Sequence, residues 1–244
     1  MILNNITFTG ADETVSPIEL INISKEYPFI EWGILFSIDK QGKEKRYPSI
    51  EWISELLQLI EQEHVGNKVK LSAHICGQYV RDLMIGENTW MNTWMESLPY
   101  FSRVQINSGV AIRYPMKEME YIRSIRLFGD RQIITQSDGM NVSHLILLGL
   151  YGFNVASLID KSGGTGKTIN NIFYPEHPSY WGYAGGLNPD NIELKLEEIN
   201  NITDKKVWID MESGIRNKND AFSIEDCITI VECSKKYVNN SFVI

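Results

Sequence analysis

Short apolar runs and amphipathic stretches alternate along the whole chain. Eight runs rich in β-branched, aromatic and other apolar residues have the length and the bounding turn residues of strands. They predict strands at Ile6–Thr9, Phe29–Ser37, Val69–Cys76, Val104–Asn107, Gln132–Ser137, Asn154–Asp160, Tyr180–Ala184 and Val207–Met211.

Between most of these runs, apolar residues recur three and four positions apart, which predicts helices. Ser49 is placed as a cap for the helix that carries Ile53, Leu56 and Ile60. The remaining helices are predicted at Pro17–Glu26, Gln78–Met95, Glu118–Leu127, Val142–Leu150, Asn188–Ile199 and Ile224–Tyr237. The connection over 168–179 holds two prolines and predicts a loop or one short turn.

Alternation of strands and helices is typical of a parallel sheet with right-handed crossovers. Eight repeats in 244 residues favour closure into a (β/α)8 TIM barrel, an α/β fold of about 250 residues. No linker or low-complexity tract marks a boundary, so we expect a single domain over residues 1–244.

Composition narrows the class of partner. The net charge of -8 argues against a nucleic-acid groove, and no run approaches the roughly 20 apolar residues of a membrane span. Three cysteines without metal-like spacing, and an N-terminus without a leader pattern, predict a reduced, cytoplasmic environment. We expect neither a cofactor nor a metal, and the oligomeric state stays open.

Three glycine turns follow the last three predicted strands, at Ser162–Gly166, Ala184–Leu187 and Ser213-Gly214. Glycines let backbone amides approach an anion, and the loops after the last strands of such a barrel commonly hold a phosphate. The candidate phosphate ligands are Gly164, Thr165, Gly166, Gly185, Gly186, Ser213 and Gly214. Gly166-Lys167-Thr168 looks like the end of a P-loop, but Lys161 stands where that motif requires glycine.

Polar side chains mark the ends of several predicted strands. Because side chains two apart on a strand share a face, such pairs predict a polar pocket at the barrel mouth. The residues are His74 and Cys76, Gln105 and Asn107, Gln136 and Asp138, Asp160, and Asp210 and Glu212. Two bland alternatives remain: a hydrogen-bonded imidazole beside a buried thiol at His74 and Cys76, and a turn-forming aspartate at Asp138. Similarly, the aromatic residues from Tyr174 to Tyr183 fit either stacking on a ligand or core packing.

The last third of the chain resembles a known family. Leu158-Ile159-Asp160, Gly163–Lys167, Ala184–Asn191, Ile209-Asp210 and Ser213-Gly214 are similar in order and spacing to phosphoribosylanthranilate isomerases of tryptophan biosynthesis. The resemblance implies a TIM barrel that binds a phosphorylated aminoribose and opens its ring by an Amadori rearrangement.

The resemblance also implies residue roles. Asp160 matches the family's general acid, and Arg46 matches the arginine that grips a substrate carboxylate, although a solvated surface charge fits Arg46 equally well. Asn107 stands where the family usually has histidine. Thr9 occupies the place of the family's catalytic cysteine, and a threonine hydroxyl is no base near neutral pH without an activator.

Two groups are candidates for the missing base. Cys76 follows His74, whose imidazolium would lower the pKa of a neighbouring thiol, and Glu212 stands beside Asp210. Alternatively, Asp210 and Glu212 accept hydrogen bonds from ribose hydroxyls or loop amides. Two functions therefore remain: an isomerase of a phosphorylated ribose derivative with Asp160 as acid, or a non-catalytic protein that binds a phosphorylated nucleoside or related metabolite.

Overall fold

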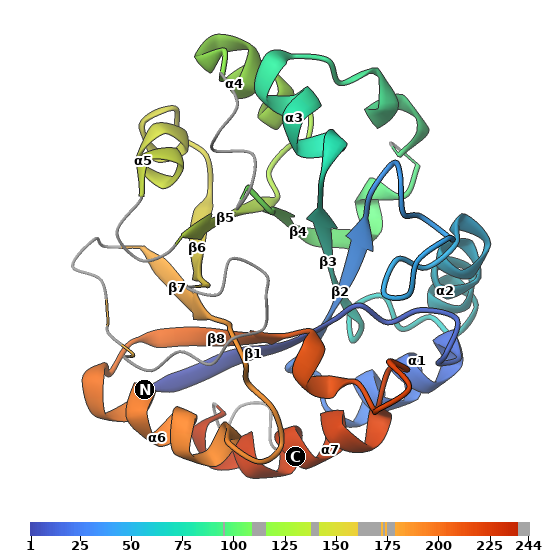
Figure 1. Cartoon of the computed structure of the whole chain (residues 1–244), viewed down its shortest axis with the longest axis vertical. Helices are drawn as coiled ribbons and strands as arrows, with labels where there is room; N and C mark the ends of the chain where they lie inside the picture. Colours follow the sequence, from blue (N-terminus) through green and yellow to red (C-terminus); the bar gives the residue numbers. More distant parts are fainter. Residues whose placement is uncertain are drawn as a thin grey trace.

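A computed structural model of the chain describes residues 1–94, 96–108, 116–137, 142–160, 172, 174 and 179–238. Its eight strands are all parallel and close into one barrel in chain order, with β8 paired to β1 (Figure 1). The strands are β1 (Ile2–Thr9), β2 (Ile30–Phe36), β3 (Lys70–Ile75), β4 (Phe101–Ile106), β5 (Gln132–Ser137), β6 (Val155–Ile159), β7 (Tyr180–Tyr183) and β8 (Lys206–Met211). The prediction of a TIM barrel is confirmed.

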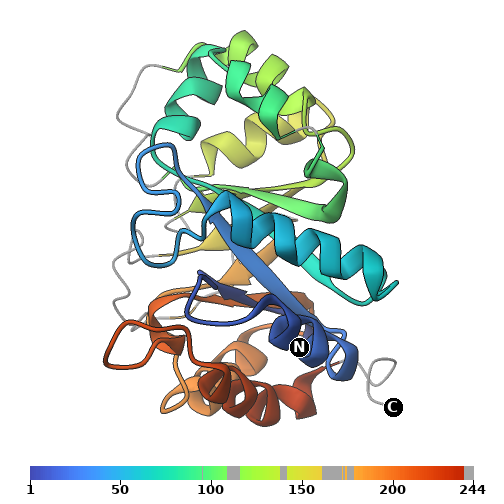
Figure 2. The ribbon, with the colours of Figure 1, turned by 90° about the vertical axis from the view of Figure 1, so that its right-hand side faces the viewer.

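Helices surround the barrel on its outside, and both views show the strands between them (Figures 1 and 2). They are α1 (Pro17–Glu26), α2 (Ile50–Gln62), α3 (Gln78–Ile85), α4 (Glu118–Arg126), α5 (Ser143–Leu150), α6 (Ile192–Ile202) and α7 (Ile224–Ser234), with 3-10 turns η1 (Thr89–Thr93), η2 (Leu98–Tyr100), η4 (Ser213–Ile215) and η5 (Lys235–Tyr237). Within the described ranges, none of these helices combines the length and apolar character that a membrane crossing requires.

Helix ends follow local chemistry. Ser49 caps α2, because its Oγ accepts a hydrogen bond from the backbone amide of Trp52 at 3.2 Å. The single helix predicted over Gln78–Met95 is wrong: Gly86, with φ of +84°, ends α3 in the left-handed conformation, and η1 follows separately. Helix α6 begins at Ile192 rather than Asn188, since Asn188 and Asn191 exchange hydrogen bonds in the turn before it. Most of the connection predicted as a loop over 168–179 lies outside the described residues.

The barrel interior is partly polar. In its lower part Arg103 donates to Glu31 at 2.9 Å, both side chains are almost fully buried, and Thr7 donates to the same carboxylate at 2.8 Å. The guanidinium lies over the ring of Trp208, 4.3 Å from its centre. Gly182 makes room for that ring, because a Cβ at this position would lie 2.1 Å from Trp208 Cε2. A buried ion pair thus holds the interior beneath the mouth.

Candidate functional site

The carboxyl ends of the eight strands open at one end of the barrel, and the predicted strand-end residues of β3 and β4 meet there in one hydrogen-bonded chain. Asn107 Nδ2 donates to Cys76 Sγ at 3.1 Å, and Gln105 Nε2 donates to Asn107 Oδ1 at 2.9 Å. The same Gln105 amide lies 3.3 Å from His74 Nδ1. Neighbouring strands therefore bring all four residues together as expected.

The environment of His74 and Cys76 differs from the expected activated thiol. Burial lowers the pKa of His74 to about 3, and the charge of Arg103 acts in the same direction, so the imidazole is neutral. Cys76 Sγ contacts the backbone carbonyl of His74 at 3.6 Å rather than its ring, and burial raises the pKa of the thiol to about 12. The bland alternative, a hydrogen-bonded imidazole and a protonated thiol, describes this pair, and nothing here activates Cys76 as a base.

A different carboxylate lies where β8 meets β1. Asp210, at the end of β8, is 6% exposed, and its Oδ1 accepts a hydrogen bond from Thr9 Oγ1 of β1 at 2.7 Å. Burial raises the pKa of Asp210 to about 7; the Thr9 hydrogen bond lowers it, and the charges of Glu212 and Glu31 raise it. A carboxyl group with that pKa exchanges protons near neutral pH. The sequence predicted Asp210 as a ligand-binding residue and not as a catalytic one. The burial that raises its pKa cannot be predicted from the strand pattern alone.

Asp160 follows β6, which lies two strands from β8 around the barrel. Gln136 of β5 donates to its Oδ2 at 2.8 Å, so the predicted neighbours on β5 and β6 are in contact. Asp160 is mostly buried, with 8% exposure. Asp138, Gly164, Thr165 and Gly166 lie outside the described residues.

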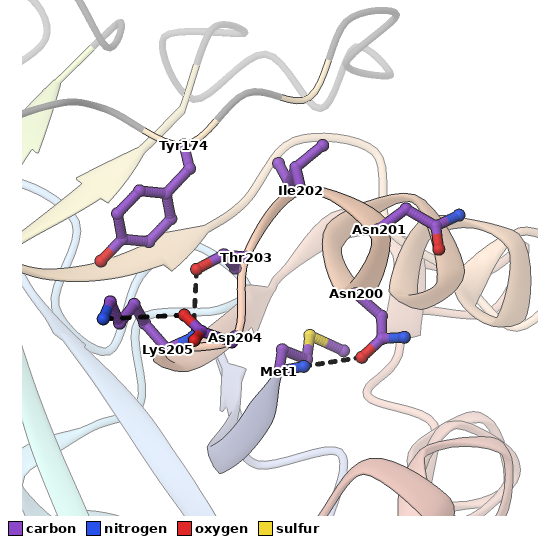
Figure 3. A pocket seen from close by; sticks show the side chains of 8 residues that line it. All are labelled: Met1, Tyr174, Asn200, Asn201, Ile202, Thr203, Asp204 and Lys205. Carbon is purple, nitrogen blue, oxygen red and sulfur yellow. Dashed lines mark hydrogen bonds and ion pairs between the residues drawn. The ribbon is translucent and has the colours of Figure 1, made fainter.

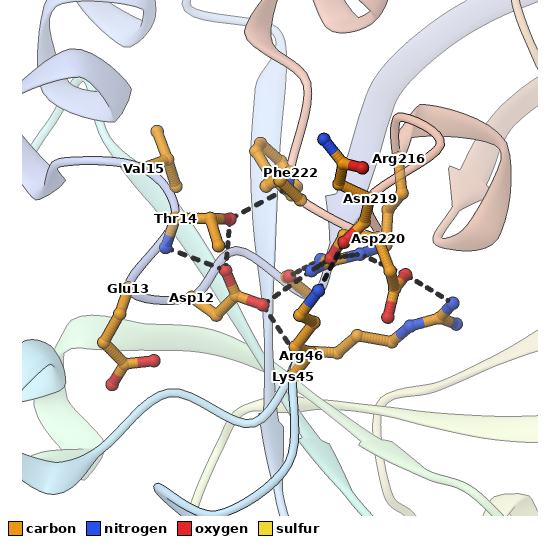
Figure 4. Close-up of polar contacts among 12 residues, drawn as sticks. Asp12, Glu13, Thr14, Val15, Lys45, Arg46, Arg216, Asn219, Asp220 and Phe222 are labelled. Atoms are coloured by element: carbon orange, nitrogen blue, oxygen red, sulfur yellow. Dashed lines mark hydrogen bonds and ion pairs between the residues drawn. The ribbon is translucent and has the colours of Figure 1, made fainter.

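Arg46 forms ion pairs at the rim with Glu212 and with Asp220. Figure 4 shows Arg46 beside Asp220 and the loop residues around them. Arg46 Nη1 lies 2.8 Å from Glu212 Oε1 and donates to Ser213 Oγ at 3.0 Å, while Nη2 lies 3.0 Å from Asp220 Oδ1. Its backbone has a left-handed φ of +75°, which the hydrogen bond from its amide to Asp12 Oδ2 at 2.7 Å helps to hold. Arg46 is therefore held in place at the rim by several contacts, and the Glu212 carboxylate is already paired with it.

Three residues of this rim were missed by sequence reasoning, namely Asp12, Arg216 and Asp220. Arg216 is buried and bonds Asp12 Oδ2 at 2.6 Å and Asp220 Oδ1 at 2.8 Å. It also donates to the carbonyl of Gly10 at 2.6 Å, which ties the loop after β8 to the loop after β1. Asp12 stands 204 positions from Arg216 in the chain, so no local motif connects the two loops.

The glycine turns after β7 and β8 pack directly on each other. Gly185 and Gly186 have φ values of +104° and +67°, which glycine adopts without strain. A Cβ on Gly214 would lie 1.9 Å from the carbonyl oxygen of Leu187, so only glycine permits this approach. The backbone amides of Gly185, Gly186, Ser213 and Gly214 make no hydrogen bond to any residue in the described part of the chain.

A pocket of about 500 Å³ lies at the other end of the barrel (Figure 3). It is lined by Met1, Tyr174, the residues 200–204 and Lys205, which precede β1 and β8. Conserved chemistry in TIM barrels gathers at the opposite face, so we do not assign the site here. Tyr180 and Trp181 also begin β7 at this lower end, and Trp181 and Tyr183 are fully buried, which makes them core residues rather than a stacking platform at the mouth.

The closed parallel barrel and the polar side chains at the carboxyl ends of its strands define a (β/α)8 TIM barrel. No protein-family model matches the chain. Over 101 residues it is 31% identical to N-(5'-phosphoribosyl)anthranilate isomerase from Crocosphaera subtropica, a match that spans 40% of this chain and 42% of the relative.

Three solved structures support the same likeness over nearly the whole chain. Phosphoribosyl anthranilate isomerase from Thermus thermophilus aligns with a TM-score of 0.56 and 15% identity, covering 95% of this chain and 98% of the other. The corresponding enzymes from Pyrococcus furiosus and Thermococcus kodakaraensis give TM-scores of 0.52 and 0.51, with 14% and 13% identity, over 97% and 96% of this chain and 100% and 99% of theirs. The local sequence match and these structures together support a phosphoribosylanthranilate isomerase-like TIM barrel.

Proposed function

We propose that the mouth of this barrel binds the phosphate of a phosphorylated ribose derivative and that the protein isomerises this ligand. The observation that carries the proposal is the pair of packed glycine turns after β7 and β8. Their amides at Gly185, Gly186, Ser213 and Gly214 have no hydrogen-bond partner among the described residues, and backbone amides gathered in this way form an anion site.

Charge at the rim supports an anion in this position. The acidic chain as a whole repels a phosphate, so binding requires local positive charge. Arg46 donates to Ser213 Oγ at 3.0 Å, which brings its guanidinium, also paired with Glu212 and Asp220, to the edge of the cradle. In TIM barrels the loops after the last two strands commonly hold a phosphate, and the relative from Crocosphaera subtropica is named for a phosphoribosyl substrate.

Asp160 is the proposed general acid. Its carboxyl group accepts a hydrogen bond from Gln136 at 2.8 Å and ends a strand two places from the cradle-bearing β8. In the reaction it would protonate the ring oxygen of the ribose, which breaks the ring C1–O bond.

One specific observation favours the alternative, a protein that binds the ligand without reaction. Thr9 replaces the cysteine that the resemblance implies as base, and Glu212, a second candidate, is bound by Arg46 at 2.8 Å. The two functions share the cradle and differ only in turnover.

Binding is tested by calorimetric titration of the full chain with inorganic phosphate and with ribose 5-phosphate. We expect saturable binding that falls at least tenfold in Gly186→Ala, because a side chain at a φ of +67° disturbs the cradle. Gly152→Ala is the matched control: Gly152 has a φ of +80°, and a Cβ there meets nothing within 4 Å. Absence of binding by the wild-type protein, or equal loss in both variants, would contradict the proposal.

Turnover is tested by NMR of ribose 5-phosphate recovered after incubation, since isomerisation changes its spectrum without changing its mass. Asp160→Asn should lower turnover by about 100-fold or more while binding stays within a few fold. Unchanged ligand recovered from the wild-type protein would leave the binding function as the correct one.

A further inference from the structure

The side chain of Asp210 is held from one side only. Oδ1 accepts the hydrogen bond from Thr9 Oγ1 at 2.7 Å, whereas Oδ2 accepts none from the described residues. Asp210 as a whole keeps 6% of its surface exposed at the carboxyl end of β8. One oxygen is thus positioned by Thr9, and the other has no hydrogen-bond partner among the described residues.

The hydrogen bonds behind Thr9 have a defined direction. The Gln105 amide group donates to Asn107 Oδ1, and so its second N–H is the one directed at His74 Nδ1, 3.3 Å away. Nδ1 is then the acceptor nitrogen of a neutral imidazole, and Nε2 carries the proton. His74 Nε2 is fully buried and has no partner among the described residues.

Gly33 of β2 lies between Thr9 of β1 and His74 of β3. A Cβ on Gly33 would lie 2.3 Å from Thr9 Oγ1 and 2.9 Å from His74 Nε2, so both atoms crowd the same point inside the barrel. Only the missing side chain of glycine leaves room for the hydroxyl and the imidazole to approach each other there. Thr9 Oγ1 can accept a hydrogen bond there and still donate to Asp210, because a hydroxyl has two lone pairs and one proton.

We propose that Asp210 is the general base of the site, with its Oδ1 positioned by a hydrogen-bond relay from His74 through Thr9. The assignment rests on the proposed isomerase function and supplies the base that Thr9 itself cannot provide. Thr9 and His74 are positioning residues, since they act through Asp210. The charged groups that act on Asp210 from the neighbouring strands are Glu212, Glu31 and Arg103.

The step balances without an added reactant. After Asp160 protonates the ring oxygen and the ring C1–O bond breaks, a lone pair of the C1 substituent forms a double bond to C1. Oδ2 of Asp210 takes the proton on C2, the C2–H electron pair becomes the C1=C2 bond, and the former double-bond pair returns to the substituent. Protonated Asp210 then delivers its proton to C1, and ionised Asp160 takes the proton of the C2 hydroxyl, so the ketose forms and both carboxyl groups return to their starting states.

The relay is tested without any ligand by NMR titration of Asp210 and of the His74 ring nitrogens. We expect Thr9→Val to raise the pKa of Asp210 by about one unit and Thr9→Ser to leave it within about 0.3 units, because serine keeps the donor. His74 should show the neutral form protonated on Nε2 from pH 5 to 8. The relay would be overturned if Thr9→Val left the pKa of Asp210 unchanged, or if the His74 ring carried its proton on Nδ1.

The base is tested with ribose 5-phosphate in D2O, where proton abstraction replaces the C2 hydrogen with deuterium. We expect exchange above the protein-free rate that rises with pH and levels off once Asp210 is ionised. It should fall about 100-fold in Asp210→Asn, fall in Thr9→Val and recover in Thr9→Ser. Binding of ribose 5-phosphate by Asp210→Asn, measured calorimetrically, should stay within a few fold.

The outcomes separate the two proposals. Ribose 5-phosphate that binds and exchanges at the wild-type rate in Asp210→Asn shows that the base is wrong while the isomerase function stands. Ribose 5-phosphate that binds without exchange in the wild-type protein overturns the base and favours the binding function. Absence of binding overturns the phosphoribosyl assignment and the base that rests on it.

Discussion

Asp210→Asn should make the stability of this protein less dependent on pH. In the folded protein, burial raises the pKa of Asp210 to about 7, against 3.8 for an unperturbed side chain. A carboxyl group whose pKa is raised by folding contributes stability that is fully present below its unfolded pKa. That contribution is lost as pH rises through the folded pKa, because the folded state holds the proton more tightly. The relevant window therefore runs from about pH 4 to pH 7.

The magnitude follows from the size of the shift. A difference of roughly three pKa units, at 1.36 kcal/mol per unit, corresponds to about 4 kcal/mol over the full window. Between pH 4.5 and pH 8 the free energy of unfolding of the wild-type protein should fall by about 3 kcal/mol relative to Asp210→Asn. The variant cannot titrate at this position, and its amide oxygen can still accept the hydrogen bond from Thr9.

The assay is urea unfolding followed by the fluorescence of the six tryptophans, for both proteins at matched pH values. Subtracting the unfolding free energies of the two proteins cancels the contributions of the other titrating groups. Asp12 and Asp220 are examples: hydrogen bonds and nearby arginines lower their pKa values in both proteins. A difference that does not change with pH, or that grows in favour of the wild-type protein as pH rises, would refute the reasoning.

Three further predictions concern the barrel interior and the reaction. Gly33→Ala should destabilise the protein by about 1–3 kcal/mol in urea unfolding, because its Cβ would lie 2.3 Å from Thr9 Oγ1. Gly66→Ala should be nearly neutral, since the atom nearest to its Cβ would be 3.9 Å away. Equal effects in the two variants would contradict the packing argument. Glu31→Gln should lower the free energy of unfolding by about 3 kcal/mol, because it leaves Arg103 charged and unpaired. Adding Arg103→Met should recover part of that loss. A loss below about 1 kcal/mol would show that the ion pair does not stabilise the barrel interior. The gene should fail to rescue growth of a tryptophan auxotroph, because Thr9 and Asn107 stand where the resemblance implies a cysteine and a histidine, so the site differs from the one that acts on that pathway's substrate. Rescue would disprove this.

Much of the fold could be predicted because each element satisfies a local rule. Helix α1 spans Pro17–Glu26 as predicted, and strand β5 spans Gln132–Ser137 as predicted. The pattern placed the starts of β1 and β4 too late, at Ile6 and Val104, because the register that extends them to Ile2 and Phe101 comes from pairing with neighbouring strands. The apolar periodicity also failed to predict the end of α3, because it continues past Gly86, whose left-handed conformation ends the helix.

The candidate site was predictable only in part. Alternation along strands identified His74, Gln105 and Asp210 as polar residues at the mouth. It did not show that burial protonates the Cys76 thiol and keeps His74 neutral, since desolvation depends on the assembled barrel. Nor did it connect Arg216 with Asp12, whose side chains meet only because the loops after β8 and β1 are adjacent in space.

The most direct measurement of the central claim is a crystal structure of the protein grown with ribose 5-phosphate. We predict that the phosphate lies within hydrogen-bond distance of the amides of Gly185, Gly186, Ser213 and Gly214, with the sugar directed toward Asp210. A phosphate bound elsewhere, or a mouth that stays free of ligand at saturating concentration, would contradict it.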